Sequence, residues 1–438
     1  MDVSDSPAPA LTQIGANTDA PQRKDLDKCV HCGLCLNSCP TYRELGVEMD
    51  SPRGRIYQMV QVAEGKAAIT DTYIEHMELC LACRGCESAC PSGVQYGRLI
   101  EAARSEIEQT IQRPWYVEAT RNFVFGTLLS SRGLLALAGA GLYLYQASGL
   151  QKLVRSSGVL KFFGRLNEIE MLSPSAETPF FFSQIGKVFP AEGERRYRVA
   201  FLAGCIANIS FARLNEATVR VLQKNGCEVH IPEAQNCCGA LHVHAGRKDD
   251  ARELAKNNID ATLDGNFDVI LTNAAGCGST LKEYDELLEH DSAYRDRAFA
   301  FKAKMKDINE FLASIEIRPP AKPFPVTVTY QDSCHLCHGQ KVRVQPRKVL
   351  NAIPGLTLKE MALSDLCCGS AGIYNVLHNE MAMNLLKNKM QNVNATGAEY
   401  IVTANPGCMI QLQAGVKLHG KDQPVLHVVE VLDRAYKG

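Results

Sequence analysis

The sequence predicts a multidomain α+β protein, in which a helical amino-terminal unit precedes a duplicated α/β region. Two dense cysteine runs lie in a segment whose apolar residues recur at helical spacing. Further along, two apolar strands each run into a cysteine, a Cys-Cys-Gly turn lies between them, and all three recur about 130 residues later. Strands and helical stretches alternate there, which is typical of a mainly parallel sheet.

Composition limits the classes of function. The chain has 438 residues, 46% hydrophobic and 22% charged, which allows several globular domains. Its formal net charge is −1. A nucleic-acid-binding protein would carry a basic footprint, so we expect no nucleic-acid partner.

Eighteen cysteines are the unusual feature of the composition. Residues 1–24 lack the basic start, apolar run and cleavage site of a signal peptide, and we expect a disordered polar tail. A chain kept in a reducing compartment seldom forms disulfides, so its cysteines should bind metal or carry out redox chemistry. Cys227 alone sits in a plain context and is interpreted as a buried core thiol.

Residues 25–110 form the first predicted unit, which contains the runs "CVHCGLCLNSCP" and "CLACRGCESACP". Each run is Cys-x2-Cys-x2-Cys-x3-Cys-Pro, the pattern of bacterial ferredoxins, where the fourth cysteine serves the other cluster. The sequence therefore predicts two 4Fe–4S clusters. Their ligands are Cys29, Cys32, Cys35 and Cys90 for the first cluster, and Cys80, Cys83, Cys86 and Cys39 for the second.

Structural zinc is the alternative for these runs, but zinc needs two pairs of ligands rather than two complete runs, each closed by proline. His31 and Arg84 lie between ligands and would tune cluster charge or simply be solvated. The stretch "SPRGRIY" (51–57) carries two arginines beside the clusters. They would pair with cluster charge or with an acidic partner, or belong to a solvated helix start.

Residues 111–195 form a predicted connector. Residues 133–150 are an uncharged stretch of eighteen residues, at the lower limit for a membrane span. Because its first half is rich in Gly and Ala, we expect a buried or interfacial helix instead. The phenylalanines that follow lie in a loop-like stretch and could dock a partner or a bilayer surface.

Residues 196–318 and 319–438 are predicted to be two α/β repeats. Equivalent cysteines are separated by 129 to 131 residues. Adjacent cysteines cannot both face one side of a strand, but a turn followed by glycine allows it. Each set could hold an iron–sulfur centre or zinc, act as a dithiol, or be a metal-free relic. The candidate metal ligands are Cys205, Cys237, Cys238 and Cys277 in the first repeat, and Cys334, Cys367, Cys368 and Cys408 in the second.

These motifs carry a family resemblance. The two repeats resemble the cysteine-rich CCG domain of heterodisulfide reductases through "CCGAL" and "CCGSAGIY". The chain from about residue 25 onward resembles the iron–sulfur subunits of glycolate oxidase. Stretches that carry this resemblance include "MDSPRGRI", "ELCLACRGCESACPSGVQYG", "NAAGCGS", "DSCHLCHGQKVRVQPR" and "NPGCMIQLQ". The chain is also similar to the anaerobic glycerol-3-phosphate dehydrogenase small subunit and to lactate-oxidising iron–sulfur proteins.

The CCG repeats depart from the heterodisulfide reductase pattern at one position each. That family ends each repeat in Cys-x2-Cys, whereas Thr280 and Gln411 stand at the final positions here. A catalytic heterodisulfide centre is therefore not expected. In the second repeat Cys337, His335 or His338 could substitute as a ligand.

The resemblance implies an electron-transfer subunit without catalytic residues of its own. It implies FAD-containing glycolate oxidase subunits as partners and a quinone or other membrane electron acceptor, because a flavin accepts a hydride and returns single electrons. We expect a cytoplasmic location, peripheral at the inner membrane. The alternatives are a heterodisulfide-reductase-like catalytic subunit, or the equivalent subunit of a lactate or glycerol-3-phosphate dehydrogenase.

Overall fold

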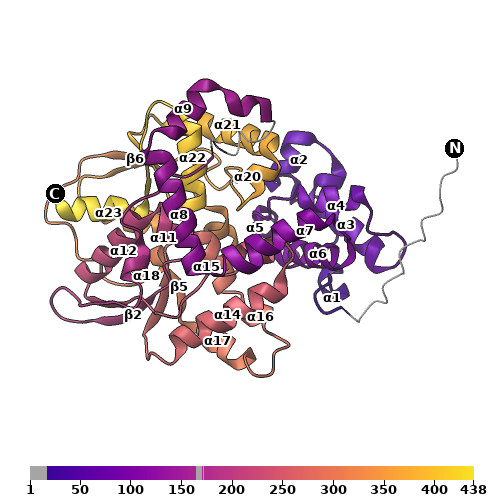
Figure 1. Ribbon diagram of the computed structural model, residues 1–438, viewed down its shortest axis with the longest axis horizontal. Coiled ribbons are helices and arrows are strands. Elements are labelled where there is room, and N and C mark those ends of the chain that lie inside the picture. The colour runs from indigo at the N-terminus through magenta and orange to yellow at the C-terminus, as the bar shows by residue number, and fades with distance from the viewer. Residues whose placement is uncertain (1–16, 164–169, 171) are drawn as a thin grey trace. The chain divides into compact units, whose positions relative to one another are not determined.

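The computed structural model describes residues 17–438, apart from 164–169 and 171 (Figure 1). The first sixteen residues of the predicted tail lie outside the described residues. Asn17 already contacts the rest of the chain, since its Nδ2 donates to Gln109 Oε1 at 2.6 Å. The chain divides into two compact units, Met1–Gln112 with Val243–Lys248, and Arg113–His242 with Asp249–Gly438. The limits predicted for smaller domains stay predictions.

Unit 1 is built from helices and turns, and its described residues contain no strand. Ser51 caps α3 by accepting a hydrogen bond from Gly54 N at 3.0 Å, and Pro52 occupies the first turn. Apolar faces of α3, α4 and α6 pack into one small core around Met59, Met77 and Ile100. The elements are α1 Arg23–Leu26, η1 Leu36–Ser38, α2 Pro40–Leu45, η2 Glu48–Asp50, α3 Pro52–Ala63, α4 Asp71–Glu78, α5 Gly85–Ser88 and α6 Tyr96–Thr110.

The connector opens unit 2 as a series of helices. The predicted apolar helix forms as α8, Arg132–Ala147, and only Leu135 and Gly139 on it are buried. No single helix within the described residues combines the length and apolar character needed to cross a membrane. The stretch Trp115–Leu128 and α8 reach that threshold only together, bent by 106°. The other elements are α7 Trp115–Arg121, the π-helix η3 Asn122–Leu128, α9 Leu150–Ser157, η4 Val159–Phe163 and η5 Phe181–Gln184.

Two sheets follow, and their strand orders reveal the duplication. The first sheet has the order β1-β3-β2-β4-β5 and the second the order β7-β6-β8-β9. All neighbours pair in parallel except the added edge strand β1. The strands are β1 Val188–Phe189, β2 Tyr197–Phe201, β3 Cys227–His230, β4 Val269–Thr272, β5 Met305–Asp307, β6 Thr327–Tyr330, β7 Thr357–Lys359, β8 Tyr400–Thr403 and β9 Val425–His427.

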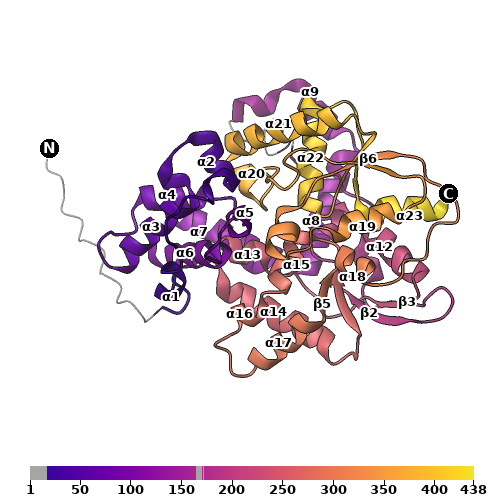
Figure 2. The ribbon, with the colours of Figure 1, turned by 180° about the vertical axis from the view of Figure 1, so that it is seen from behind.

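The two repeats share one hydrophobic core, which contains Val199 and Leu271 from the first sheet and Val328 and Val402 from the second. Figure 2 shows the helices around the sheets. They are α11 Ala207–Ser210, α12 Ala212–Lys224, α13 Ala240–His244, α14 Lys248–Leu263, α15 Ala275–Leu281, α16 Tyr284–Leu287, α17 Arg295–Lys304, α18 Ile308–Ser314, the π-helix η6 His335–Gly339, α19 Gln345–Asn351, α20 Tyr374–Leu377, α21 Asn379–Thr396, α22 Pro406–His419 and α23 Val428–Lys437. The predicted α+β multidomain class is confirmed.

Candidate cluster-binding sites

The two cysteine loops of unit 1 share an unusual backbone. His31 and Gly33, two and four residues after Cys29, have φ of 53° and 85°. Ala82 and Arg84, at the same positions after Cys80, have φ of 50° and 62°. Left-handed backbone costs about 1–3 kcal/mol for residues other than glycine. Backbone of this kind points successive N–H groups toward a bound anion. An anionic group bound by each loop would therefore offset the energetic cost of its left-handed residues.

Cys39 lies with the second loop rather than with its own. One cavity, partly open to solvent, is lined by Cys39, Cys80, Cys83 and Cys86. Cys39 has extended backbone at the start of α2, where Pro40 occupies the first position of the helix. Four thiols on one cavity are a donor set that suits an iron–sulfur cluster.

Cys90 approaches the first loop in the reciprocal way. Burial raises the pKa of Cys29, and negative charge on Cys90 and Cys32 raises it further. Burial also raises the pKa of Cys35 to about 11. These bare thiols are therefore neutral near pH 7, and a metal must displace their protons when it binds.

The CCG cysteines follow the carboxyl ends of parallel strands. Cys205 follows β2, the pair Cys237-Cys238 follows β3, and Cys277 lies on α15 directly after β4. In the second repeat, Cys334, Cys367-Cys368 and Cys408 follow β6, β7 and β8 in the same way. Open parallel sheets build their sites at this edge, so the fold itself gathers each set.

Thiol contacts connect each CCG set from one cysteine to the next. In the first repeat Cys205 contacts Cys237, which contacts Cys238, which contacts Cys277. The pKa of Cys205 is raised mainly by its contact with Cys237 and secondly by burial. The second repeat has the same succession through Cys334, Cys367, Cys368 and Cys408.

A preformed site for a single ion is absent from the described residues: they contain no group of three or more His, Cys, Asp or Glu placed to hold one metal ion. The thiolates of a tetrahedral zinc site converge on one point about 2.3 Å away. The CCG thiols instead touch in succession. Their assignment as metal ligands stays a prediction.

Comparison with known proteins agrees with this architecture. A 4Fe-4S dicluster domain model matches residues 25–94, a model for the linker region of the glycolate oxidase iron-sulfur subunit matches 117–173, and a cysteine-rich domain model matches 199–282 and 328–413. The "Probable glycolate oxidase iron-sulfur subunit" of Bacillus subtilis is 42% identical over 93% of both chains. The "Glycolate oxidase iron-sulfur subunit" of Escherichia coli is 33% identical over 94% of both.

The chain belongs to the family of glycolate oxidase iron–sulfur subunits. It is thus an iron–sulfur protein and one component of a multi-subunit oxidoreductase. A "Lactate utilization protein A" of Oceanobacillus iheyensis is similar over a shorter stretch, with 30% identity over 55% of this chain and 98% of that one. The family predicted from the motifs is confirmed.

Other buried side chains stand at the two positions where this chain lacks the final cysteine of the heterodisulfide reductase pattern. Gln411 is fully buried, and its Oε1 accepts a hydrogen bond from Asn375 Nδ2 at 3.0 Å. Thr280 is buried in α15. His338 Nε2 lies 3.0 Å from the carbonyl oxygen of Asp365, as a hydrogen-bonding loop residue would. Cys337 is buried, which raises its pKa to about 12.

Cys227 lies on β3 inside the shared core, as predicted, and burial raises its pKa to about 12.

Sequence reasoning missed the roles of two residues near the cysteines. It did not distinguish the environments of the two arginines in residues 51–57, of which only Arg55 is fully buried. It also missed Lys389, a buried lysine whose Nζ donates to the carbonyl oxygen of Leu363 at 2.7 Å. Neither Arg55 nor Lys389 belongs to a sequence motif whose spacing would indicate its role.

The glycine of each CCG turn has a conformational reason. Gly239 and Gly369 have φ of 81° and 89°. A methyl group at Gly369 would lie 2.5 Å from the carbonyl oxygen of Ala382. The turn that presents two adjacent thiols therefore needs glycine for both its dihedral angles and its space.

We expect Gly369→Ala to destabilise unit 2 by about 2–4 kcal/mol, because left-handed strain and the approach to Ala382 add together. Thermal or denaturant unfolding of the anaerobic protein measures this. Gly141→Ala is the control, since a methyl group there meets nothing within 4 Å, and helix propensity predicts a gain of up to about 1 kcal/mol. Equal stability of the two variants would show that the turn tolerates a side chain.

Proposed function

We propose that this subunit holds two 4Fe–4S clusters on crosswise cysteine sets and transfers electrons without catalysing the oxidation itself. The shared cavity of Cys39 with Cys80, Cys83 and Cys86 is the observation that carries the proposal. The first cluster would be held by Cys29, Cys32, Cys35 and Cys90. When bound, the clusters supply one-electron redox chemistry, and the chain positions them and surrounds them with charge.

Crosswise ligation predicts an unexpected effect of Cys39→Ser. The substitution lies in the first run, yet it should perturb the cluster of the second, lowering the iron content by about four atoms per chain. Paramagnetic resonance of the reduced protein would identify the cluster that remains. Its spectrum should match that of Cys83→Ser. A match to Cys32→Ser would mean that Cys39 serves its own run.

The CCG sets are where we propose that a further iron–sulfur centre binds. Eight thiols gather there in two successions at the edges of the sheets. Iron in excess of eight atoms per chain in the protein prepared anaerobically would support a third centre. The heterodisulfide-reductase-like alternative lacks support at Thr280 and Gln411, which bring no thiol.

The electrons would come from an FAD-containing subunit that oxidises glycolate and would leave toward a membrane quinone. A hydride carries two electrons, which a flavin can accept and then release singly to clusters. The family and the names of its members support glycolate as the substrate.

Reconstitution of this chain with its flavoprotein subunits tests the proposal. We expect glycolate-dependent quinone reduction, and we expect Cys32→Ser and Cys83→Ser each to lower it at least ~100-fold, because either interrupts the single-electron route. The flavoprotein alone should still reduce an artificial two-electron acceptor. Full quinone reduction with both variants would end the electron-transfer assignment, and turnover with lactate instead of glycolate would correct the substrate.

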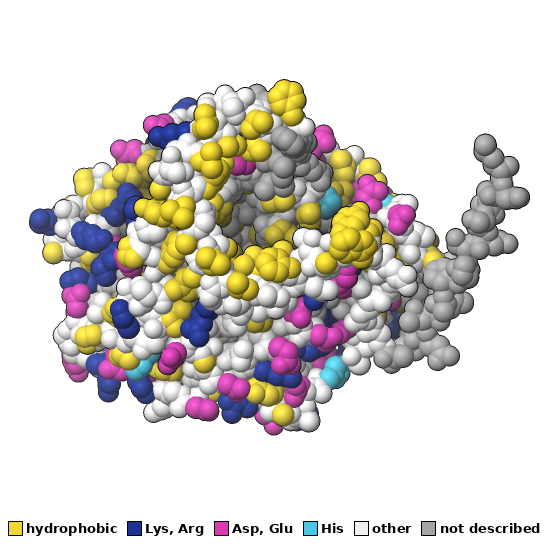
Figure 3. All heavy atoms as spheres, in the orientation of Figure 1, with side chains coloured by type: hydrophobic (Ala, Val, Ile, Leu, Met, Phe, Trp, Pro, Cys, Tyr) yellow, Lys and Arg dark blue, Asp and Glu magenta, His cyan; other side chains and the backbone are white. Residues whose placement is uncertain are grey.

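We propose a peripheral location at the inner face of the membrane. Exposed apolar side chains gather on the connector, and Figure 3 shows apolar side chains along the face that carries α8. They include Trp115, Leu137, Leu144, Leu153 and Phe162. On α9, Lys152 stands beside Leu153 and suits the surface of an anionic bilayer, whereas Arg155 is paired with Glu170 at 2.7 Å.

Co-sedimentation with anionic lipid vesicles tests this location. The double variant Leu137→Glu/Leu144→Glu should lower vesicle binding by about tenfold or more, since charged groups resist insertion among acyl chains. Phe299→Glu, at an exposed position of α17, is the control and should bind like the wild type. Equal binding of both variants would remove the connector from membrane attachment, and release from membranes only by detergent would contradict a peripheral association.

A further inference from the structure

Two arginines of α3, Arg53 and Arg55, lie two positions apart and reach different cysteine sets. Arg55 lines the cavity of Cys39, Cys80, Cys83 and Cys86. Arg53 instead contacts the first loop, where its Nη1 donates to the carbonyl oxygen of His31 at 3.0 Å. One helix thus provides a cation to each proposed cluster.

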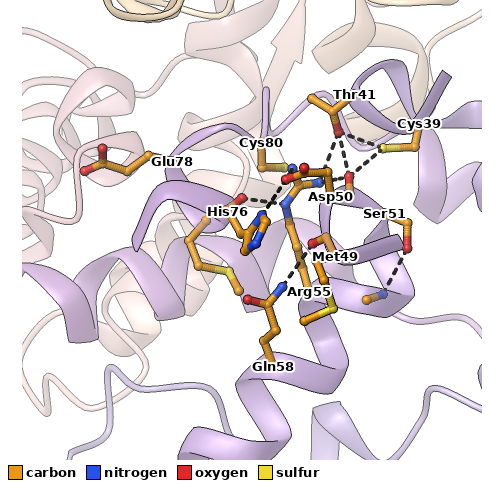
Figure 4. A network of polar contacts seen from close by, with 12 residues as sticks. Cys39, Thr41, Met49, Asp50, Ser51, Arg55, Gln58, His76, Glu78 and Cys80 are labelled. Atoms are coloured by element: carbon orange, nitrogen blue, oxygen red, sulfur yellow. Dashed lines mark hydrogen bonds and ion pairs between the residues drawn. The ribbon is translucent and has the colours of Figure 1, made fainter. Parts of the chain in front are cut away.

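Arg55 is held in a buried network beside Cys39, drawn in Figure 4. Its Nη1 donates to Thr41 Oγ1 at 3.2 Å, and that oxygen lies 3.2 Å from Cys39 Sγ. Its Nε donates to the carbonyl oxygen of His76 at 2.6 Å, and its Nη2 lies 3.3 Å from Asp50 Oδ1. The side chain is 0% exposed. The guanidinium is therefore fixed and shielded from water.

Burial by itself lowers the pKa of Arg55, but the anionic forms of Cys80, Tyr96 and Cys39 raise it, and the net shift is upward. The guanidinium stays charged at every ordinary pH. The nearest carboxylate, on Asp50, is shared with the His76 ring, whose Nδ1 lies 2.8 Å from the same oxygen.

Arg53 differs in solvation and in pairing. Its side chain is 30% exposed, and Nε and Nη2 hold both oxygens of Glu48 at 2.6 and 3.1 Å. A methyl group on Gly33 would lie 2.7 Å from Arg53 Nη1, which shows how closely this arginine covers the first loop. Water and Glu48 together screen its charge.

Burial affects the two proposed clusters unequally. Cys39, Cys80 and Cys86 are buried, whereas Cys32 is exposed. Reduction adds one negative charge, which a low-dielectric site disfavours and a nearby fixed cation favours. The second cluster would thus be harder to reduce than the first if no charge compensated its burial.

We propose that Arg55 raises the reduction potential of the cluster held by Cys39, Cys80, Cys83 and Cys86, while Arg53 changes that of the other cluster only weakly. This inference rests on the proposed cluster assignment. The compensation brings the buried cluster close enough in potential to its exposed neighbour for an electron to pass between them. In the complex that electron comes from the partner flavin, and in a titration it comes from dithionite.

The test is a reductive titration of the anaerobic full-length protein, followed by paramagnetic resonance, with Cys32→Ser used to assign the two steps. We expect Arg55→Gln to disfavour the second cluster's reduction by at least tenfold, which is 59 mV for one electron. Arg53→Gln, the matched control on the same helix, should shift the first cluster by less than threefold. A shift below threefold in Arg55→Gln, with both clusters retained, overturns the proposal.

Asp50→Asn separates charge from structural disturbance, because it breaks the same network but removes a negative charge. Its second cluster should become easier to reduce, opposite to Arg55→Gln, and Arg55→Lys should stay near the wild type. If Arg55→Gln loses the cluster, Asp50→Asn decides alone, and an unchanged or lowered potential overturns the proposal. An iron-free wild type would instead contradict the cluster assignment, so the two failures are distinguishable.

Discussion

The position of Cys39 is the constraint on which the rest of unit 1 depends. To reach the second loop, Cys39 must leave the loop that holds Cys29, Cys32 and Cys35, and α2 begins directly after it. The unit's core is small, and it includes Cys80 and Cys86 themselves. Under the proposed ligation, segments about 50 residues apart would be joined through their cysteines as well as by apolar packing. In such a unit the free energy of cluster binding is also free energy of folding.

Unit 2 solves a similar problem through chain duplication. Each sheet places three cysteine-bearing segments at the same edge, because strand order brings three parallel strands of the repeat together. The two repeats meet at these segments. Ala275 N donates to the carbonyl oxygen of Ala404 at 3.3 Å, and Gly276 N donates to Asn405 Oδ1 at 3.2 Å. The starts of α15 and α22, which carry Cys277 and Cys408, thus hold one another in place.

The spacing of cysteines, glycines and apolar residues along the sequence was enough to predict the elements that the chain forms. The two cysteine runs and the CCG turns follow from spacings of a few residues, the duplicated strands follow from a recurrence about 130 residues later, and the structure has each of them. Spacing could not separate Arg53 from Arg55, because both fit a helix start, and only the packing of α3 against Asp50 and His76 excludes water from one of them. Nor could it predict that Val243–Lys248 joins unit 1, where Arg104 donates to the carbonyl oxygen of His244 at 3.2 Å.

Charge, more than ligand chemistry, distinguishes the otherwise similar sites of this chain. In the second CCG repeat the buried Lys389 lies near Cys367 and Cys368. The equivalent position in the first repeat is the neutral Asn258, whose Nδ2 donates to the carbonyl oxygen of Cys237 at 2.9 Å. Unit 1 shows the same contrast between a buried and a solvated arginine. A buried cation stabilises added negative charge much more than an exposed one does, because water no longer screens it. Under the proposed assignment of iron–sulfur centres to these sets, a single neighbouring side chain would make duplicated thiol sets differ in electron affinity, with their cysteines unchanged.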